Sequence, residues 1–153
     1  MTDSRSPREV FLALVNGIAD GRRGDLASLY AEQTDVIHPF DPLRAPALRT
    51  RDELREHFGP DDAGTRHRGR PASITIHETT DPEVIVAEFE YQLTAAGSGE
   101  PVALPGIFVL RVRDGQIVSR DYFDHVTAAR IRGQLGELVA AVSARAGGSA
   151  TTH

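Results

Sequence analysis

Apolar residues in the first third of the chain recur at the spacing of helices. Ser6-Pro7-Arg8-Glu9 combines a capping box with proline at the first helical position, and it predicts the start of a helix. The apolar stripe of this helix consists of Val10, Phe11, Leu14, Val15 and Ile18. Asp25 can cap a second short helix, and Thr50-Arg51-Asp52-Glu53 is a second capping box, whose helix ends before Gly59. Between them, residues 34–38 are expected to form a short strand that a proline-punctuated loop follows.

From residue 72 onward the apolar positions alternate with a period of two, which is the pattern of β-strands. Strands are expected over residues 74–77, 83–93, 101–113 and 116–123. Asp114-Gly115 joins the last two, because Asp-Gly tolerates the positive φ angles of a type I′ hairpin turn. Proline donates no hydrogen bond to a ladder, so Pro105-Gly106 is expected to mark a bulge or bend in a curved sheet.

A last helix is expected from Thr127, and residues 147–153 are expected to be a disordered tail. The apolar stripe of this helix consists of Ile131, Leu135, Leu138, Val139 and Val142. Residues 1–146 then form one domain, since a chain of 153 residues has single-domain length and shows no internal repeat. Helices segregated from an antiparallel meander predict an α+β fold, in which the N-terminal helices wrap a curved antiparallel sheet into a cone with an internal pocket.

The composition limits which binding partners and which cellular location we expect. The 17 basic residues are outnumbered by 22 acidic ones and are scattered, which argues against nucleic acid as a partner. No stretch approaches the roughly 20 apolar residues of a membrane span, and we expect neither a membrane segment nor a signal peptide. The chain has no cysteine, which excludes thiol chemistry and fits a reducing compartment, so we expect a cytoplasmic location.

Candidate chemistry gathers where the hairpin ends, in Asp121-Tyr122-Phe123-Asp124-His125. Ionisable groups beside aromatic rings at the end of a strand are a common way to place an acid or base at the mouth of a pocket. His38 also ends a predicted strand, and imidazole is the side chain best matched to proton transfer near neutral pH. The six histidines show no paired metal-ligand spacing, and the glycine-rich loops match no phosphate-binding motif. We therefore expect no metal and no cofactor.

Over residues 7–142 the chain resembles the nuclear transport factor 2-like superfamily. The resemblance lies in the order of the elements, in the hairpin over residues 111–118 and in the ending Arg120-Asp121-Tyr122-Phe123-Asp124. The likeness is to its small-enzyme branches: SnoaL-like polyketide cyclases, ketosteroid isomerase relatives, phenazine-biosynthesis proteins and limonene epoxide hydrolase. The resemblance implies the cone-shaped fold. It does not select one reaction, because this fold hosts many chemistries and some proteins with none.

The hairpin ending is similar to that of limonene epoxide hydrolase, in which the final carboxylate is catalytic, and this implies a catalytic role for Asp124. The arginine and aspartate of that enzyme's partner strand fall on Glu88 and Glu90. The tyrosine and asparagine that hold its attacking water fall on Val36 and His38. Because only one position of the set is unchanged, water attack in that manner is disfavoured. The residues that remain are suited to moving protons.

Each candidate also has a structural interpretation. Asp124 can cap the last helix, Tyr122 can pack in the core, and His38 can be a surface or core imidazole. Alternation along their strand places Glu88 and Glu90 toward water, whereas the resemblance allows them to face the pocket.

We expect a small cofactor-free enzyme of secondary metabolism that cyclises, isomerises or dehydrates an apolar polyketide- or terpenoid-like molecule. Asp124 is then the main acid/base and His38 its counterpart. Glu90 and Tyr122 orient polar groups, and Glu88 completes the catalytic set. The expected substrate-binding residues are Tyr30, Phe11, Phe40, Phe58 and Phe108.

Two alternatives stay open: an epoxide hydrolase or epoxide-opening cyclase of the same fold, and a non-catalytic dimeric protein that binds a small molecule. A homodimer is expected in any case, because two neighbouring strands offer more apolar surface than one layer of helices can cover. The apolar residues are Ile85, Ala87, Phe89, Tyr91 and Leu93 on one strand and Ile107 and Val109 on its neighbour.

Overall fold

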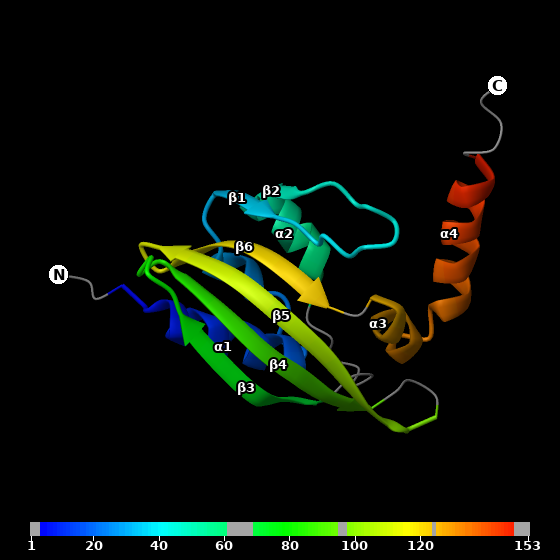
Figure 1. Ribbon diagram of the computed structural model, residues 1–153, viewed down its shortest axis with the longest axis horizontal. Coiled ribbons are helices and arrows are strands. Elements are labelled where there is room, and N and C mark those ends of the chain that lie inside the picture. The colour runs from blue at the N-terminus through cyan, green and yellow to red at the C-terminus, as the bar shows by residue number, and fades with distance from the viewer. Residues whose placement is uncertain (1–3, 61–68, 95–97, 124, 149–153) are drawn as a thin grey trace.

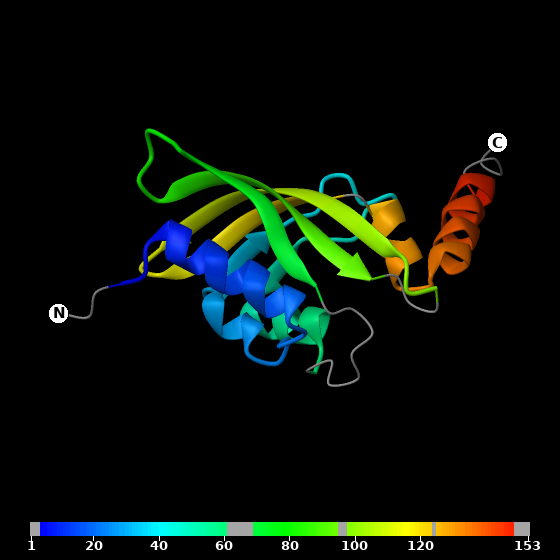
Figure 2. The ribbon, with the colours of Figure 1, turned by 90° about the horizontal axis from the view of Figure 1, so that it is seen from below.

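The computed structural model describes residues 4–60, 69–94, 98–123 and 125–148, with the side chains of residues 119–123 and 148 excepted. In chain order the elements are α1 (Pro7–Ala19), the 3₁₀ helix η1 (Leu26–Leu29), β1 (Gln33–Val36), β2 (Leu48–Thr50), α2 (Arg51–Phe58), β3 (Arg70–Glu78), β4 (Val84–Thr94), β5 (Pro101–Arg113), β6 (Gln116–Phe123), α3 (His125–Ile131) and α4 (Leu135–Gly148). Figure 1 shows the long curved strands of the sheet, with α3 and α4 beyond its end. In Figure 2, α1 and α2 lie on the concave side of the sheet. The predicted α+β class is confirmed.

Helix α1 begins where the sequence predicts it. The Glu9 N–H donates to the Ser6 hydroxyl and the Ser6 N–H donates to the Glu9 carboxylate, so both halves of the capping box form. At α2 only the first half forms, because the Glu53 carboxylate accepts a hydrogen bond from the N–H of Arg49 instead of from Thr50. Arg49 belongs to β2, a three-residue strand paired with β1 that the sequence pattern did not predict.

The main sheet has the strand order β3-β4-β5-β6, and all neighbours are antiparallel. In the β5–β6 turn, Asp114 has a φ of 51° and Gly115 a φ of 74°. Both central residues therefore have the positive φ angles that the predicted hairpin turn requires.

The expected bulge at Pro105-Gly106 is absent from the β4–β5 ladder, which pairs without interruption from Val84 to Thr94. The described pairing of β5 with β6 ends at Gly106, one residue from Pro105, so a missing proline N–H disturbs that ladder little. The irregular register occurs in β3 instead, where Ser73 has a φ of 52°.

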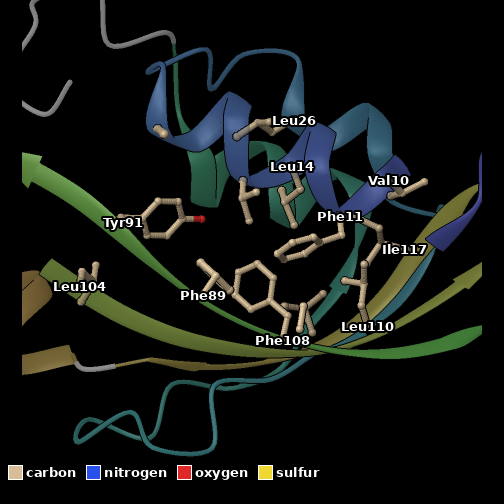
Figure 3. Close-up of a cluster of buried hydrophobic side chains, with 14 of the residues drawn as sticks. Val10, Phe11, Leu14, Leu26, Phe89, Tyr91, Leu104, Phe108, Leu110 and Ile117 are labelled. Carbon is tan, nitrogen blue, oxygen red and sulfur yellow. The ribbon is translucent and has the colours of Figure 1, made fainter. Parts of the chain in front are cut away.

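The core lies between α1 and the concave face of the sheet. Figure 3 shows Phe11 reaching from α1 toward Phe89 on β4 and Phe108 on β5. The ring centroid of Phe11 lies 5.4 Å from that of Phe89 and 6.1 Å from that of Phe108, with edge-to-face geometry in both pairs. The fully buried aliphatic residues around them include Val10, Leu14, Val15, Leu110 and Ile117. The apolar stripe predicted for the first helix is thus the stripe that packs on the sheet.

The C-terminal helix is broken, where the sequence predicts one helix from Thr127. Helix α3 ends at Ile131, Gly133 has a φ of 71°, and α4 begins at Leu135. A glycine with positive φ is a common end of a helix. Helix α4 extends to Gly148, past the predicted start of the tail, and lies beyond the end of the sheet in both views (Figures 1 and 2). Its Arg145 donates a hydrogen bond to the carbonyl of Leu43, in the loop after β1. None of the described helices is long and apolar enough to cross a membrane.

Candidate functional site

A cavity of about 470 Å³ lies between the sheet and the helices α1, α2 and α3. This volume is within the range of small-molecule binding sites. Most of its lining is apolar or aromatic and includes Tyr30, Phe58, Phe89, Tyr91 and Phe108. Besides the two tyrosine hydroxyl groups, the polar side chains in the lining are His38, His57, Arg23 and Arg132. A cavity of this composition can hold an apolar molecule and present a few polar groups to it.

Three of the five predicted substrate-binding residues lie in this lining, namely Tyr30, Phe58 and Phe108. The backbone of Tyr30 is held from two sides, since its carbonyl accepts a hydrogen bond of 2.9 Å from Arg51 Nε and the residue bridges to Ile117 of β6. Phe58, the last residue of α2, places its ring centroid 5.8 Å from that of Tyr30. Their contact with a substrate remains a prediction.

His38 belongs to a cluster of three histidines, His38, His57 and His125, which we call the histidine cluster. The His38 ring stacks on the His57 ring at a centroid distance of 5.5 Å, and it meets the His125 ring edge-on at 6.0 Å. The three residues come from the segment after β1, the last turn of α2 and the first position of α3. His38 and His57 line the cavity. The cluster therefore places imidazoles, which exchange protons near neutral pH, against an apolar site.

Asp41 gives the histidine cluster a negatively charged neighbour. Its carboxylate accepts hydrogen bonds from the backbone N–H groups of Leu43 and Ala45, at 2.8 and 2.9 Å. Partial burial acts to raise the pKa of Asp41, but these two donors and the positive potential of His125 and His38 together hold it below its ordinary value. Asp41 is therefore ionised at neutral pH, and its negative charge lies within electrostatic reach of His125 and His38.

Asp41 is expected to make stability depend on pH in acid. Because its pKa is lowered by folding, the carboxylate contributes stability above its unfolded-state pKa of about 3.9, and this contribution is lost as the pH falls through the lower folded-state pKa. Asp41→Asn should unfold more easily than wild type at pH 7 by about 1 kcal/mol, the usual net value of one hydrogen bond. Urea unfolding at pH 7 and pH 2.5 should show this difference shrinking in acid. Asp25→Asn is the control, since the Asp25 side chain makes no capping hydrogen bond. An equal difference at both pH values would contradict the prediction.

The structure corrects the expected position of Glu88 and Glu90. Both alternate along β4 with the buried Ala87, Phe89 and Tyr91, so they lie on the convex face of the sheet, away from the cavity. On that face Glu88 accepts a hydrogen bond of 2.6 Å from His77 Nε2, and Glu90 accepts one of 3.2 Å from Gln92. The alternation of the strand indicated this placement, whereas the resemblance to limonene epoxide hydrolase allowed the opposite one.

Phe11 and Phe40 are likewise not part of the cavity lining. Phe11 is fully buried in the core, where the α1 stripe packs on the sheet. The Phe40 side chain is 69% exposed and lies in the proline-punctuated loop after β1. Their assignment as substrate-binding residues is therefore corrected.

Asp124 lies outside the described residues, and Tyr122 is described by its backbone alone. The Tyr122 backbone pairs with Ile107 across the β5–β6 ladder. His125, the residue after Asp124, begins α3 beside His38. The roles assigned to Asp124 and Tyr122 remain predictions of the sequence.

Sequence reasoning missed His57, Arg23 and Arg132. Arg23 lies in the segment between α1 and η1, and Arg132 lies in the segment between α3 and α4. A charged side chain between helices ordinarily faces water, so no local pattern marked either residue. His57 was missed because only tertiary packing brings it to His38. In the described part of the chain, no three histidine, aspartate or glutamate side chains are grouped as metal ligands.

The curved antiparallel sheet encloses the cavity together with the helices, as expected for the fold of the nuclear transport factor 2-like superfamily. The SnoaL-like domain matches residues 11–120, and the chain belongs to this family. Over 101 residues it is 33% identical to an uncharacterized PhzA/B-like protein of Pseudomonas aeruginosa, a match that covers 59% of this chain and 69% of that protein.

Solved structures share the fold at low sequence identity. A proposed isomerase from Bacillus subtilis aligns with a TM-score of 0.70 and 19% identity, over 84% of this chain and 93% of that one. A phenazine biosynthesis-related protein from Pseudomonas aeruginosa aligns with a TM-score of 0.62 and 18% identity, over 84% and 81% of the two chains. The epoxide hydrolase/cyclase-like enzyme SalBIII, of pyran ring formation in salinomycin, aligns with a TM-score of 0.59 and 13% identity, over 78% and 92%. At these identities the likeness shows the fold alone.

Proposed function

We propose that this protein is a cofactor-free acid/base enzyme that isomerises, cyclises or dehydrates an apolar, oxygenated small molecule. The observation that carries the proposal is the stacked His38–His57 pair, which lines an apolar cavity of about 470 Å³. Imidazole is the general acid or base most often used by enzymes, and an enclosing wall holds the reacting carbon close to it. A polyketide- or terpenoid-like substrate of secondary metabolism is supported by membership of the SnoaL-like family, because the sequence resembles the polyketide cyclases among its relatives.

In this mechanism the neutral imidazole of His38 removes a proton from a carbon next to a substrate carbonyl. The electrons of the broken C–H bond form an enolate, and His38 becomes an imidazolium ion. The carboxylate of Asp41 stabilises that positive charge. Return of the proton at another carbon gives isomerisation, attack of the enolate carbon on a second carbonyl gives cyclisation, and loss of a β-hydroxyl group gives dehydration. His57, stacked on His38, is placed to supply the second proton transfer.

Asp124 and Tyr122 remain in the proposal on the strength of the sequence. The likeness of the hairpin ending to that of limonene epoxide hydrolase supports Asp124 as an acid/base. Tyr122, two residues earlier on β6, would then orient a polar group of the substrate.

The proton-transfer step can be tested with 2-tetralone, a bicyclic ketone with acidic α-protons. We expect the wild-type protein to accelerate exchange of these protons for deuterium in D₂O, followed by NMR, above the rate of buffer with the same imidazole content. Binding of 2-tetralone without faster exchange would contradict the enzyme and favour a small-molecule-binding protein. Hydrolysis of limonene oxide without such exchange would favour the epoxide-opening alternative.

We also propose that the protein is a homodimer, through the Ile107 and Val109 part of the surface first expected and not through the β4 face. Ile85, Ala87, Phe89 and Tyr91 are buried within the chain and are not available for a partner. The convex face of the sheet carries Ile107, which is 40% exposed, and the partly exposed Val84, Val86 and Val109. Sedimentation should give twice the 16.6 kDa mass of the chain, and Ile107→Lys should shift it to the monomer. A wild-type monomer at micromolar concentration would contradict the dimer.

A further inference from the structure

Two arginines that the acid/base mechanism does not use line the same cavity. Arg23 comes from the segment between α1 and η1, and Arg132 from the segment after α3, so only the fold brings them together. Across the described residues, neither forms an ion pair with a carboxylate. The neighbouring Arg22 is different, since it pairs with Asp20 at 3.0 Å and does not line the cavity.

The two guanidinium groups act on each other electrostatically. Arg132 is exposed to solvent on one side and surrounded by protein atoms on the other. The loss of water around its guanidinium group is the larger cause that lowers the pKa of Arg132, and the positive charge of Arg23 is the smaller one. Without a bound anion, two guanidinium groups that lie near each other and are partly removed from water repel each other. A bound anion would relieve both the repulsion and the desolvation.

The length of α3 sets the spacing between Arg132 and the histidine cluster, and this spacing fits one small molecule. His125 is the first residue of α3 and Arg132 follows its last, a separation of seven residues. At a rise of 1.5 Å per residue, these two backbone positions are about 10 Å apart along the helix. The cavity wall between them is apolar and includes Ala128 and Ile131 of the same helix.

We propose that Arg23 and Arg132 form an anion-binding subsite, and that the substrate is an apolar molecule with an acidic group, a carboxylate or a phosphate monoester. Guanidinium groups bind both oxyanions through paired, charge-assisted hydrogen bonds. The anion anchors one end of the molecule, and the apolar body lies along the cavity toward His38 and His57. This inference rests on the proposed function, because it assumes that the same cavity holds the reacting molecule.

Three probes with the same ring system test the subsite: 2-naphthoate, 2-naphthyl phosphate and the uncharged 2-naphthamide. Their dissociation constants are measured by isothermal titration calorimetry on the full chain. We expect wild type to bind at least one anion about tenfold or more tightly than the amide, as one or two charge-assisted hydrogen bonds provide. The preferred anion identifies the acidic group.

Arg23→Gln and Arg132→Gln should each reduce this preference severalfold, and the double variant should remove it. Affinity for 2-naphthamide should stay at the wild-type level, which shows that the variants are folded and that their cavity is intact. Arg22→Gln, the same change one position away, should keep the preference. Equal binding of anions and amide by wild type would overturn the subsite and leave the acid/base site standing. Failure of all three probes to bind would overturn the subsite and would also count against the cavity as a ligand site.

Discussion

His38→Asn is expected to slow the α-proton exchange of 2-tetralone by about 10²–10⁴-fold, the usual contribution of a general acid or base. Asparagine keeps a polar side chain of similar reach, but it cannot accept and carry the proton. Because His38 lines the cavity and carries the proton in the proposed mechanism, the loss should fall on the rate of exchange more than on the affinity for the ketone. Initial exchange rates and dissociation constants, measured on the same samples, separate the two effects.

The convex face of the sheet supplies a matched control. His77 is also a histidine with a carboxylate partner, Glu88, but it lies on the face away from the cavity. His77→Asn should therefore exchange 2-tetralone at the wild-type rate. An exchange rate within a few-fold of wild type in His38→Asn, or an equal loss in His77→Asn, would remove His38 from the mechanism.

The same assay decides the sequence-based role of Asp124. If Asp124 transfers protons, Asp124→Asn should lose activity to an extent comparable with His38→Asn. If it only caps the last helix, asparagine caps equally well, and neither the rate nor the stability should change. The second result would leave His38 and His57 as the proton-transferring pair.

The elements that the sequence predicted well are those whose cause is local. Ser6 and Glu9 fix the start of α1 within one turn, and Asp114-Gly115 fixes the hairpin because few residue pairs accept two positive φ angles. The alternation on β4 also placed Glu88 on the convex face. It gave the better prediction of orientation, because side-chain direction in a strand depends on sequence parity alone.

The parts of the site that the sequence could not predict depend on tertiary packing. His38, His57 and His125 meet across three separate elements, and no spacing between them has a meaning before the fold exists. The same holds for Arg23 and Arg132. Caps, turns and strand faces could therefore be predicted in large part, because their cause is local. In the cavity, the sequence predicted His38, Tyr30, Phe58 and Phe108 one by one, but it did not predict that His57, Arg23 and Arg132 join them.

Phe11→Ala is expected to destabilise the protein by about 3–5 kcal/mol, the usual effect of removing a buried phenylalanine ring. The Phe11 side chain is fully buried, and its ring packs edge-to-face against Phe89 and Phe108, which also line the cavity wall. Removing the ring takes away the free energy gained by burying it, and it also leaves an empty space that the sheet and the helix do not fill. Both effects lower the free energy of unfolding. Urea unfolding at pH 7 measures the change.

Two other phenylalanines provide the comparison that separates packing from substrate binding. Phe40→Ala should change stability by less than about 1 kcal/mol, because the Phe40 side chain is 69% exposed. Phe58→Ala should weaken 2-tetralone binding, since Phe58 lines the cavity beside Tyr30. If Phe11→Ala kept wild-type stability but lost affinity for 2-tetralone, Phe11 would be a substrate-binding residue after all. If it unfolds at much lower urea and Phe58→Ala loses affinity, α1 holds the floor of the cavity in place, and α2 contributes the side chain that contacts the ligand.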